Sequence, residues 1–316
     1  MKTLLTGGAG FIGSHLADRL LAEGHCVACV DDLSLGRREN ISHNFGEARF
    51  KFIKADAADA CALETVFKRN RFDCVFHLAA NSDIRAGGDC PDIDLNRTFL
   101  TTYRVLEAMR KYGVKKLVFA STSAVYGEGG KAFGEDSGPL SPVSLYGAGK
   151  LACEAWINAF CANFGMQSWI IRFPNVVGPR ATHGALFDFT NRLRENPRKL
   201  LILGNGRQKK PYLHVRDLVD GILFVFKRAK ARINVYNAAG EGVTTVDEIA
   251  RAAVSAAGLK NVRFSYTGGS RGWKGDVPRF RYDISKITRL GWKASMSSAA
   301  AVRAAARELH EETCGK

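Results

Sequence analysis

Short apolar runs alternate with longer amphipathic segments through the first half of the chain. Helical periodicity fills residues 11–23, 96–111 and 145–164, and Gly24 supplies a stop after the first of these segments. Strands alternating with helices indicate an α/β fold with a doubly wound parallel sheet, covered on both faces. The apolar runs predict six strands, at residues 2–6, 26–30, 50–53, 74–78, 116–120 and 167–172.

The pattern loosens after Pro174. Residues 204–208 and 267–276 are rich in glycine and polar side chains and are expected to be loops, and helices are expected at 246–257 and 298–310. We therefore predict two domains. Residues 1–173 form a nucleotide-binding domain, to which the chain returns at about 213–240, and residues 174–316 form a smaller α/β substrate domain.

Composition narrows the class of protein. The 316 residues are 46% hydrophobic, enough for a sizeable core, and no apolar run reaches the roughly 18 residues that span a bilayer. Glycines interrupt the apolar N-terminal run at once, so we expect neither a signal peptide nor a membrane association. The eight cysteines have no accompanying histidine cluster, which favours reduced thiols in a cytoplasmic protein over disulfides or a metal site.

The formal net charge of +15 raises the possibility of a nucleic-acid partner. Lysine and arginine are spread along the whole chain, however, with only short pairs such as Arg37-Arg38 and no basic tail. We expect a solvated basic surface and no nucleic-acid partner. Such a surface also attracts a small anionic substrate.

A glycine motif lies between the first predicted strand and the first predicted helix. It reads T-G-G-A-G-F-I-G and contains Gly7, Gly10 and Gly13. Glycines at this place allow a tight turn and a close approach of the backbone to a pyrophosphate at the helix N-terminus, as in Rossmann-type domains. Asp31 follows Gly13 by 18 residues, near the spacing of a ribose-binding carboxylate. That carboxylate would repel a 2′-phosphate and favours NAD, while the neighbouring Arg37 leaves NADP open.

Tyr146 and Lys150 are four residues apart in the predicted helix at 145–164, so they share a face. An ammonium group beside a phenol favours the phenolate, which can act as a general base. The same spacing also fits an ordinary amphipathic helix with a half-buried tyrosine.

At this point the sequence resembles the extended short-chain dehydrogenase/reductase family, and within it the nucleotide-sugar epimerases of the UDP-galactose 4-epimerase type. The resemblance covers nearly the whole chain. It rests on segments that occur in the family's order: T-G-G-A-G-F-I-G, D-D-L-S-L-G-R-R-E-N, K-A-D-A-A-D, F-H-L-A-A-N, F-A-S-T-S-A-V-Y-G, Y-G-A-G-K, R-F-P-N-V-V-G-P-R, T-H-G-A-L-F-D-F, G-N-G-R-Q-K-K-P-Y-L-H-V-R-D and R-G-W-K-G-D-V-P.

The resemblance implies roles for individual residues. The catalytic set would be Thr122, Tyr146 and Lys150. The implied NAD-binding residues are Gly7, Gly10, Phe11, Ile12, Gly13, Asp31, Asp32, Leu33, Ser34, Gly36, Arg37, Asp56, Ala57, Leu78, Ala79, Ala80, Tyr146, Lys150 and Phe173. The implied substrate-binding residues are Asn81, Arg85, Thr122, Ser123, Asn175, His183, Phe187, Gln208, Lys210, Arg271 and Asp276.

The sequence departs from the family pattern at several positions. Thr98 stands where the family often has an asparagine. The usual diphosphate-binding arginine close before G-D is absent; Lys274 stands there and Arg271 lies further back, as in a subgroup with R-G-W-x-G-D-V. Phe280 falls near a position that gates the size of the sugar in the family.

The implied reaction is NAD-dependent epimerisation at C4 of a UDP-hexose through a transient 4-keto sugar. A 4,6-dehydratase would resemble T-D-E-V-Y-G, but both carboxylates are replaced, and Ala124 also disfavours a decarboxylase. A 4-ketosugar reductase needs exchangeable NADPH, which Asp31 disfavours. A UDP-glucuronate 4-epimerase remains open, and so does a non-catalytic NAD-binding sensor. The family also implies a homodimer through the helices at 96–111 and 145–164.

Overall fold

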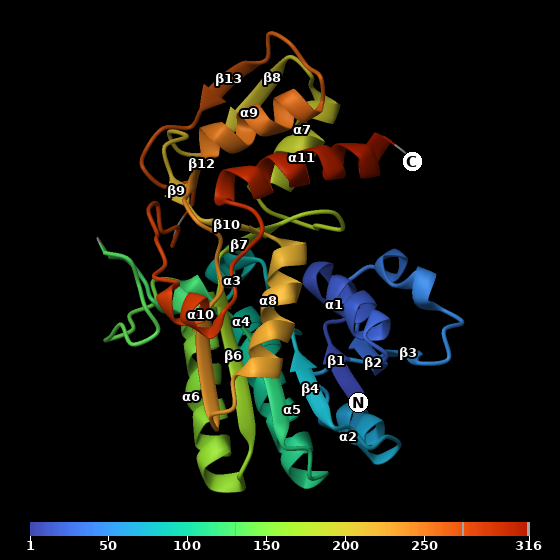
Figure 1. Ribbon diagram of the computed structural model, residues 1–316. Helices are drawn as coiled ribbons and strands as arrows, with labels where there is room; N and C mark the ends of the chain where they lie inside the picture. The colour runs from blue at the N-terminus through green and yellow to red at the C-terminus, as the bar shows by residue number, and fades with distance from the viewer. Residues whose placement is uncertain (130, 274, 315–316) are drawn as a thin grey trace. The chain divides into compact units, whose positions relative to one another are not determined.

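The computed structural model describes residues 1–129, 131–273 and 275–314, and their positions in the chain are shown in Figure 1. The chain divides into two compact units. The first contains Met1–Val125, Ser144–Arg172 and Ile222–Tyr236, and the second contains Tyr126–Val143, Phe173–Gly221 and Asn237–Lys316. Within the described residues, no helix is long and apolar enough to cross a membrane.

The first unit is built on a seven-stranded sheet with the order β11-β6-β5-β4-β1-β2-β3. The pairs β1–β2, β2–β3, β1–β4 and β4–β5 are parallel. The chain therefore starts in the middle of the sheet and builds outward first to one side and then to the other, which confirms the doubly wound fold. The strands are β1 (Lys2–Thr6), β2 (Cys26–Asp31), β3 (Phe50–Lys54), β4 (Cys74–His77), β5 (Lys116–Thr122), β6 (Gln167–Phe173) and β11 (Ile233–Asn237).

All six strands expected from the apolar runs are present, with ends shifted by two residues or fewer. The pattern did not predict β11, which is short and ends on polar residues.

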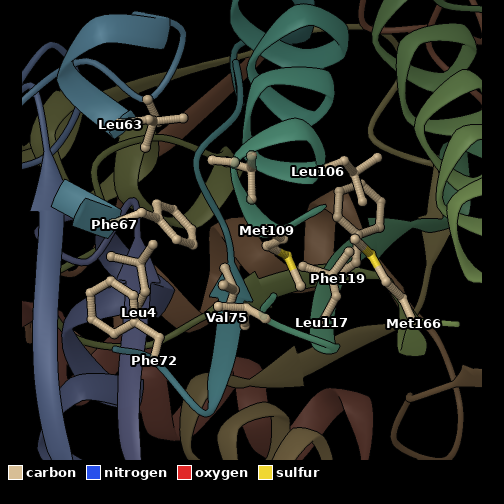
Figure 2. Close-up of a cluster of buried hydrophobic side chains, with 14 of the residues drawn as sticks. Leu4, Leu63, Phe67, Phe72, Val75, Leu106, Met109, Leu117, Phe119 and Met166 are labelled. Atoms are coloured by element: carbon tan, nitrogen blue, oxygen red, sulfur yellow. The ribbon is translucent and has the colours of Figure 1, made fainter. Parts of the chain in front are cut away.

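Helices cover both faces of this sheet. On one face, α2 (Ala60–Lys68), α5 (Thr101–Lys111) and α6 (Leu145–Phe164) bury apolar side chains against the strands. Figure 2 shows this core, in which Leu63, Phe67, Leu106 and Met109 lie close to the strand residues Leu4, Val75, Leu117 and Phe119.

On the other face lie α1 (Phe11–Ala22) and residues 222–228 of α8 (Val215–Arg228). The ring of Phe226 packs edge-on against Phe76 of β4 and Trp169 of β6. Alternate residues of one strand thus serve opposite cores, since Val75 belongs to the first face and Phe76 to the second.

The predicted helix at 96–111 differs from the structure. A π-helical segment, η3 (Leu95–Leu100), precedes α5, and two short helices, α3 (Ile84–Asp89) and α4 (Pro91–Asp94), lead into it. The hydroxyl groups of Thr101 and Thr102 donate to the carbonyl oxygens of Asn96 and Thr98. Threonine hydroxyls that bond to the preceding turn disturb regular helices, which accounts for the change of pitch. The remaining turns of this unit are η1 (Arg38–Asn40), η2 (Ser42–Asn44) and η4 (Ser123–Val125).

The second unit contains three small two-stranded sheets and a layer of helices. The pairs are β7 (Asn175–Val177) with β10 (Tyr212–His214), β8 (Lys199–Ile202) with β13 (Arg263–Tyr266), and β9 (Lys209–Lys210) with β12 (Thr244–Thr245). The helices are α7 (Ala185–Glu195), α9 (Val246–Ala256), α10 (Ser285–Leu290) and α11 (Ser298–Cys314). The expected helices at 246–257 and 298–310 are α9 and α11, whereas α7 and α8 were not predicted.

The segment Tyr126–Val143 belongs to the second unit, although the sequence pattern left it in the first domain. The Tyr126 hydroxyl donates to Asn237 Oδ1 at 2.7 Å, and the Tyr126 ring stacks on Phe133. Phe133 in turn stacks on Phe280, with ring centroids 5.3 Å apart. The contacts of Tyr126 with Asn237 and of Phe133 with Phe280 join residues more than 100 positions apart, and no local pattern could indicate them.

Candidate active site

The glycine loop follows β1 directly and leads into α1. Gly7 has a φ of +70°, and a Cβ there would lie 2.7 Å from the Ala79 nitrogen; a Cβ at Gly13 would lie 2.1 Å from the Gly7 carbonyl oxygen. Both positions therefore require glycine. Gly10 is the N-cap of α1. Because glycine has no side chain that could cap the helix, no side chain of the N-cap residue accepts the first backbone N–H groups of α1. This backbone fits a dinucleotide pyrophosphate, which uses such N–H groups as donors.

Asp31 ends β2 at the same edge of the sheet and is 7% exposed. Its two carboxylate oxygens accept the backbone N–H groups of Ala9 and Leu33 at 2.9 and 2.8 Å. Burial raises the pKa of Asp31, and these hydrogen bonds oppose that shift. The carboxylate is thereby fixed beside the glycine loop, where a ribose hydroxyl can donate to a remaining lone pair.

The other expected cofactor residues follow the carboxyl ends of neighbouring strands. Asp32 accepts the N–H and hydroxyl of Ser34, and Arg37 donates its backbone N–H to Ala9. Asp56 is exposed just after β3 and Ala57 beside it is buried. Open α/β sheets bind their ligands at this edge, where the strand order reverses. The residues that remain at least partly exposed here are Phe11, Ile12, Leu33, Gly36, Leu78, Ala79 and Ala80, and Phe173 ends β6 with a partly exposed ring.

Thr122, Tyr146 and Lys150 meet at the end of β5. Thr122 is the last residue of β5, and its hydroxyl is close enough to the Tyr146 hydroxyl to lower the pKa of that phenol. Lys150 lies one turn further along α6, is 3% exposed, and donates from Nζ to the Ala120 carbonyl oxygen at 2.7 Å. The structure thus brings the three expected catalytic side chains together within the first unit.

The protonation of this set differs from the expectation. Burial raises the pKa of Tyr146 to about 12, while the nearby Thr122 hydroxyl lowers it and the charge of Asp94 raises it further. Burial lowers the pKa of Lys150 to about 8. The sequence predicted that Lys150 would lower the pKa of Tyr146, but burial dominates both groups, and the protein's own charges leave the phenol protonated at neutral pH.

A buried polar network around His77 was not predicted from the sequence. His77 is fully buried, with Nδ1 2.6 Å from the Thr6 hydroxyl and Nε2 3.0 Å from the Thr102 hydroxyl. The Cys153 thiol donates to the same Thr102 hydroxyl. Burial lowers the pKa of His77 to about 3, so the ring is neutral. The F-H-L-A-A segment indicated a buried strand end. It did not indicate the other members of the network, Thr6, Thr102 and Cys153, which come from β1, α5 and α6.

A buried ion pair fixes α6 against β6. The Arg172 guanidinium donates to both Glu154 oxygens, at 3.0 and 2.6 Å, and the side chains are 6% and 5% exposed. Ser121 donates to the same carboxylate. A paired charge of this kind holds α6 in register with the strands that carry the catalytic set.

The expected substrate residues of the first unit differ in their exposure to solvent. Asn81 is 3% exposed; its amide donates to Asp83 O and Asp94 Oδ1, and its side-chain oxygen accepts the Asp83 N–H. These bonds fix the loop after β4, and the expected contact of Asn81 with substrate stays a prediction. Arg85 is exposed on α3 and Ser123 is partly exposed in η4.

In the second unit, four expected residues form one cluster. Lys210 pairs with Asp276, which is 2% exposed and also accepts the Gly272 N–H. Arg271 donates to the Asp276 carbonyl oxygen and pairs with Glu128 at 2.7 Å. Gln208 is 4% exposed and donates to Leu203 O. Asp276 therefore holds Lys210 through its carboxylate and Arg271 through its carbonyl oxygen, and its own expected contact with substrate stays a prediction.

The other candidates of this unit lie on β7 and near α7. Asn175 is exposed on β7, His183 is exposed before α7 with Nδ1 3.1 Å from the Thr182 hydroxyl, and Phe187 is partly buried on α7. Phe280 is 6% exposed and stacked between other rings, and Lys274 lies outside the described residues.

The described residues contain no group of three or more histidine, cysteine, aspartate or glutamate side chains placed to hold a metal ion. Cys26 and Cys29 do follow a C-x-x-C spacing. They lie in β2, where residues three apart point to opposite faces, and both are free: Cys26 is exposed and Cys29 buried.

The fold and the site together define a class of protein. Short-chain dehydrogenases and reductases, which use a nicotinamide dinucleotide, combine a doubly wound parallel sheet with an uncapped glycine loop, a carboxylate at the end of β2 and a Thr–Tyr–Lys set. The chain belongs to the NAD dependent epimerase/dehydratase family, whose model matches residues 3–239.

Individual relatives agree with this assignment. The chain is 34% identical over 308 residues to a UDP-glucose 4-epimerase of Mycolicibacterium smegmatis, with 95% of each chain covered. The UDP-glucose 4-epimerase of Thermotoga maritima, solved with UDP-glucose, is 30% identical over the full length of both chains, with a TM-score of 0.89. The Thermus thermophilus enzyme, solved with NAD, is 31% identical with 98% of each chain covered and a TM-score of 0.86.

Proposed function

We propose that the protein interconverts the C4 epimers of a UDP-hexose, UDP-glucose and UDP-galactose, and retains NAD through turnover. The meeting of Thr122, Tyr146 and Lys150 at the sheet edge that carries the glycine loop is the observation that carries the proposal. It places a potential general base and a hydroxyl donor at the edge where this fold binds its cofactor.

The roles of the three side chains follow from their contacts. Tyr146, once ionised, accepts the proton of the sugar's 4-hydroxyl and returns it when the 4-keto sugar is reduced on its other face. Thr122 lies beside Tyr146 and orients the reacting oxygen. Lys150, tied to Ala120, places a positive charge beside the site and stabilises the anion that forms.

The residues present fit NAD. Gly7, Gly10 and Gly13 would hold the pyrophosphate, Asp31 the adenosine ribose, and Lys150 the nicotinamide ribose. When bound, NAD supplies reversible hydride removal from a carbon that carries a hydroxyl, and its oxidised ring adds a positive charge.

The residues after Thr122 favour epimerisation over dehydration. Ser123 and Ala124 occupy η4, where a 4,6-dehydratase would need an acid and a base to act at C5 and C6. Neither side chain has a carboxylate. The chain can therefore remove and return a proton at the 4-hydroxyl but has no groups here for the elimination of water.

The second unit is proposed to bind the nucleoside diphosphate. Lys210 and Arg271 lie around Asp276, and cations with fixed geometry form charge-assisted hydrogen bonds with phosphate oxygens. Asn175, His183, Phe187 and Gln208 would complete this site. The two units then divide the work into NAD binding and substrate binding.

We also propose a homodimer through α5 and α6. An apolar groove on α6 is lined by Ala155, Trp156, Ala159, Phe160, Asn163 and Phe164. Trp156 is 41% exposed and meets the rings of Phe99 and Tyr103 edge-on. A large exposed aromatic surface of this kind is typical of an interface. Light scattering should give twice the 34.5 kDa chain mass, and Trp156→Glu should give a monomer.

A reducing, cytoplasmic setting is proposed as well, supported by free thiols at Cys26, Cys61 and Cys90 on the surface. The basic surface is proposed to attract the anionic substrate and to have no nucleic-acid partner. A nucleic-acid titration in low salt should show no saturable binding.

The test is incubation of the purified protein, with no added cofactor, with UDP-glucose, UDP-galactose, their N-acetyl forms and UDP-glucuronate. Proton NMR of the anomeric region would then show a C4 epimer with UDP-glucose and UDP-galactose as the fastest pair. Epimerisation of UDP-glucuronate alone would favour the uronate alternative. No epimer from any sugar, even with added NAD, would contradict the proposal and favour an NAD-binding sensor.

A further inference from the structure

Asp94, the last residue of α4, is a buried carboxylate that the proposed reaction does not use. It is 2% exposed, and its Oδ1 accepts the Asn81 amide at 2.9 Å. Its Oδ2 has no hydrogen-bond partner among the described residues. Gly87 makes room for this oxygen, because a Cβ there would lie 1.9 Å from it. A half-satisfied buried carboxylate is costly when ionised, so its placement asks for an explanation.

The placement becomes clear from the packing of two helical segments. Asp94, Thr98 and Thr102 follow each other at intervals of four residues, so they lie on one side of their segment. On α6, one face is shared by Tyr146, Gly149, Lys150 and Cys153. A Cβ at Gly149 would lie 3.5 Å from a Thr98 methyl and 3.7 Å from the Asp94 carbonyl oxygen. The Cys153 thiol reaches Thr98 O and Thr102 Oγ1. Asp94 therefore lies at the level of Tyr146 and Lys150.

The charges around Asp94 are few. Burial is the largest influence on the pKa of Asp94 and raises it; the hydrogen bond from Asn81 and the charge of Lys150 lower it, and the charge of Asp83, which caps α3, raises it. Asp94 acts in return on the catalytic pair, since its negative charge raises the pKa of Tyr146 and that of Lys150. The carboxylate therefore opposes ionisation of the phenol and supports the ammonium.

We propose that Asp94 is a positioning residue that sets the pH range in which the Tyr146–Lys150 pair is active. The inference rests on the proposed function, because it concerns the same pair. An ionised Asp94 keeps the ammonium of Lys150 charged to higher pH and delays the phenolate of Tyr146. The unpartnered Oδ2 leaves Asp94 free to gain or lose a proton without breaking its bond with Asn81.

The first test is Asp94→Asn, which keeps the shape and the acceptor for Asn81 but cannot ionise. In the NAD-loaded enzyme we expect both limbs of the kcat profile to move to lower pH by at least about half a unit, with KM nearly unchanged. Asp92→Asn, an exposed position on the same helix, should leave the limbs where they are. A merely structural role would lower the rate at every pH without moving the limbs, and that result would overturn the proposal.

A second measurement does not depend on turnover. The absorbance of tyrosinate, compared between each protein and its Tyr146→Phe partner, gives the ionisation of Tyr146 alone. The midpoint should be lower in Asp94→Asn than in the unchanged chain, and equal midpoints would overturn the proposal even if the enzyme acts on another substrate. If Asp94→Asn does not fold, Asp94→Ser takes its place, because it removes the same charge and should move the midpoint in the same direction.

Discussion

Lys150 Nζ donates to the carbonyl oxygen of Ala120 at 2.7 Å, so the helix that carries Tyr146 is tied to the strand that carries Thr122. The bond explains why a buried ammonium is tolerated there: it satisfies one N–H while the ring of Phe119 lies 4.6 Å away. The catalytic set is thus fixed by a main-chain contact of the lysine as well as by side-chain contacts.

Tyr146→Phe should lower kcat by at least about 100-fold, because it removes the group that accepts and returns the proton. The NAD content should stay unchanged, since the ring is retained. Anomeric proton NMR gives the rate, and the absorbance of the denatured protein's supernatant gives the cofactor content. Tyr266→Phe, at an exposed tyrosine whose hydroxyl bonds Asp247, should have full activity. Equal losses in both variants would argue against a specific role of Tyr146.

Lys150→Met should change how stability depends on pH. Burial lowers the pKa of Lys150 from 10.5 to about 8, so between these values the unfolded chain binds more protons than the folded protein. The free energy of unfolding then rises with pH in this window, by up to about 3 kcal/mol, and the methionine variant lacks this rise. Urea unfolding of both proteins at pH 7.5 and pH 9.5 checks it. Parallel pH dependences would show that Lys150 is not buried as described.

Gly13→Ala should abolish retention of NAD and lower the melting temperature, because its Cβ would lie 2.1 Å from the Gly7 carbonyl oxygen. The matched control is Gly88→Ala in α3, where a Cβ meets nothing within 4 Å. That change should leave NAD bound and leave stability equal or raise it by up to about 1 kcal/mol, since alanine favours helix. Calorimetry with a cofactor assay separates the two. A Gly13→Ala protein with full NAD would contradict the close packing of the loop.

Glu154→Gln should destabilise the first unit by about 3–5 kcal/mol, because Arg172 is left charged and buried. Replacing both partners by apolar side chains, as in Glu154→Leu with Arg172→Met, should restore most of this loss. Denaturant midpoints give the energies. Glu64→Gln serves as the control, since its pair with Lys111 is exposed and its loss should not be measurable. A double variant as unstable as Glu154→Gln would mean that the pair is not the cause.

Most of the sheet could be predicted from local patterns. The inner residues of runs such as Lys2–Thr6 and Gln167–Phe173 are buried on both faces, and a strand buried in this way is mainly apolar. Helix α9 was also predicted, and the structure shows that Thr245 and Glu248 form a capping box at its start. The π segment at Leu95–Leu100 was not predicted, since it depends on threonine hydroxyls bonding to particular carbonyl groups.

The residues of the site could be predicted from the sequence in part, as the sheet could. Gly7, Gly13, Asp31, Tyr146 and Lys150 could be found from the sequence because a pyrophosphate, a ribose and a proton-transfer pair each require particular residue types at short spacings. Their ionisation could not, because burial, which no spacing indicates, decides the pKa of Tyr146 and Lys150.

The sequence by itself determined the order of elements and predicted the cofactor loop and the reacting side chains, since each depends on residues near one another in the chain. Only the tertiary structure decided that Asp94 lies beside Tyr146 and Lys150, that the Asn81 amide donates to Asp94, and that Asp276 holds Lys210. The relationship of Asp94 with Tyr146 and Lys150 and that of Asp276 with Lys210 join residues tens of positions apart. They arise when whole elements pack, so the charge and solvation of each side chain are settled by neighbours that no local pattern contains.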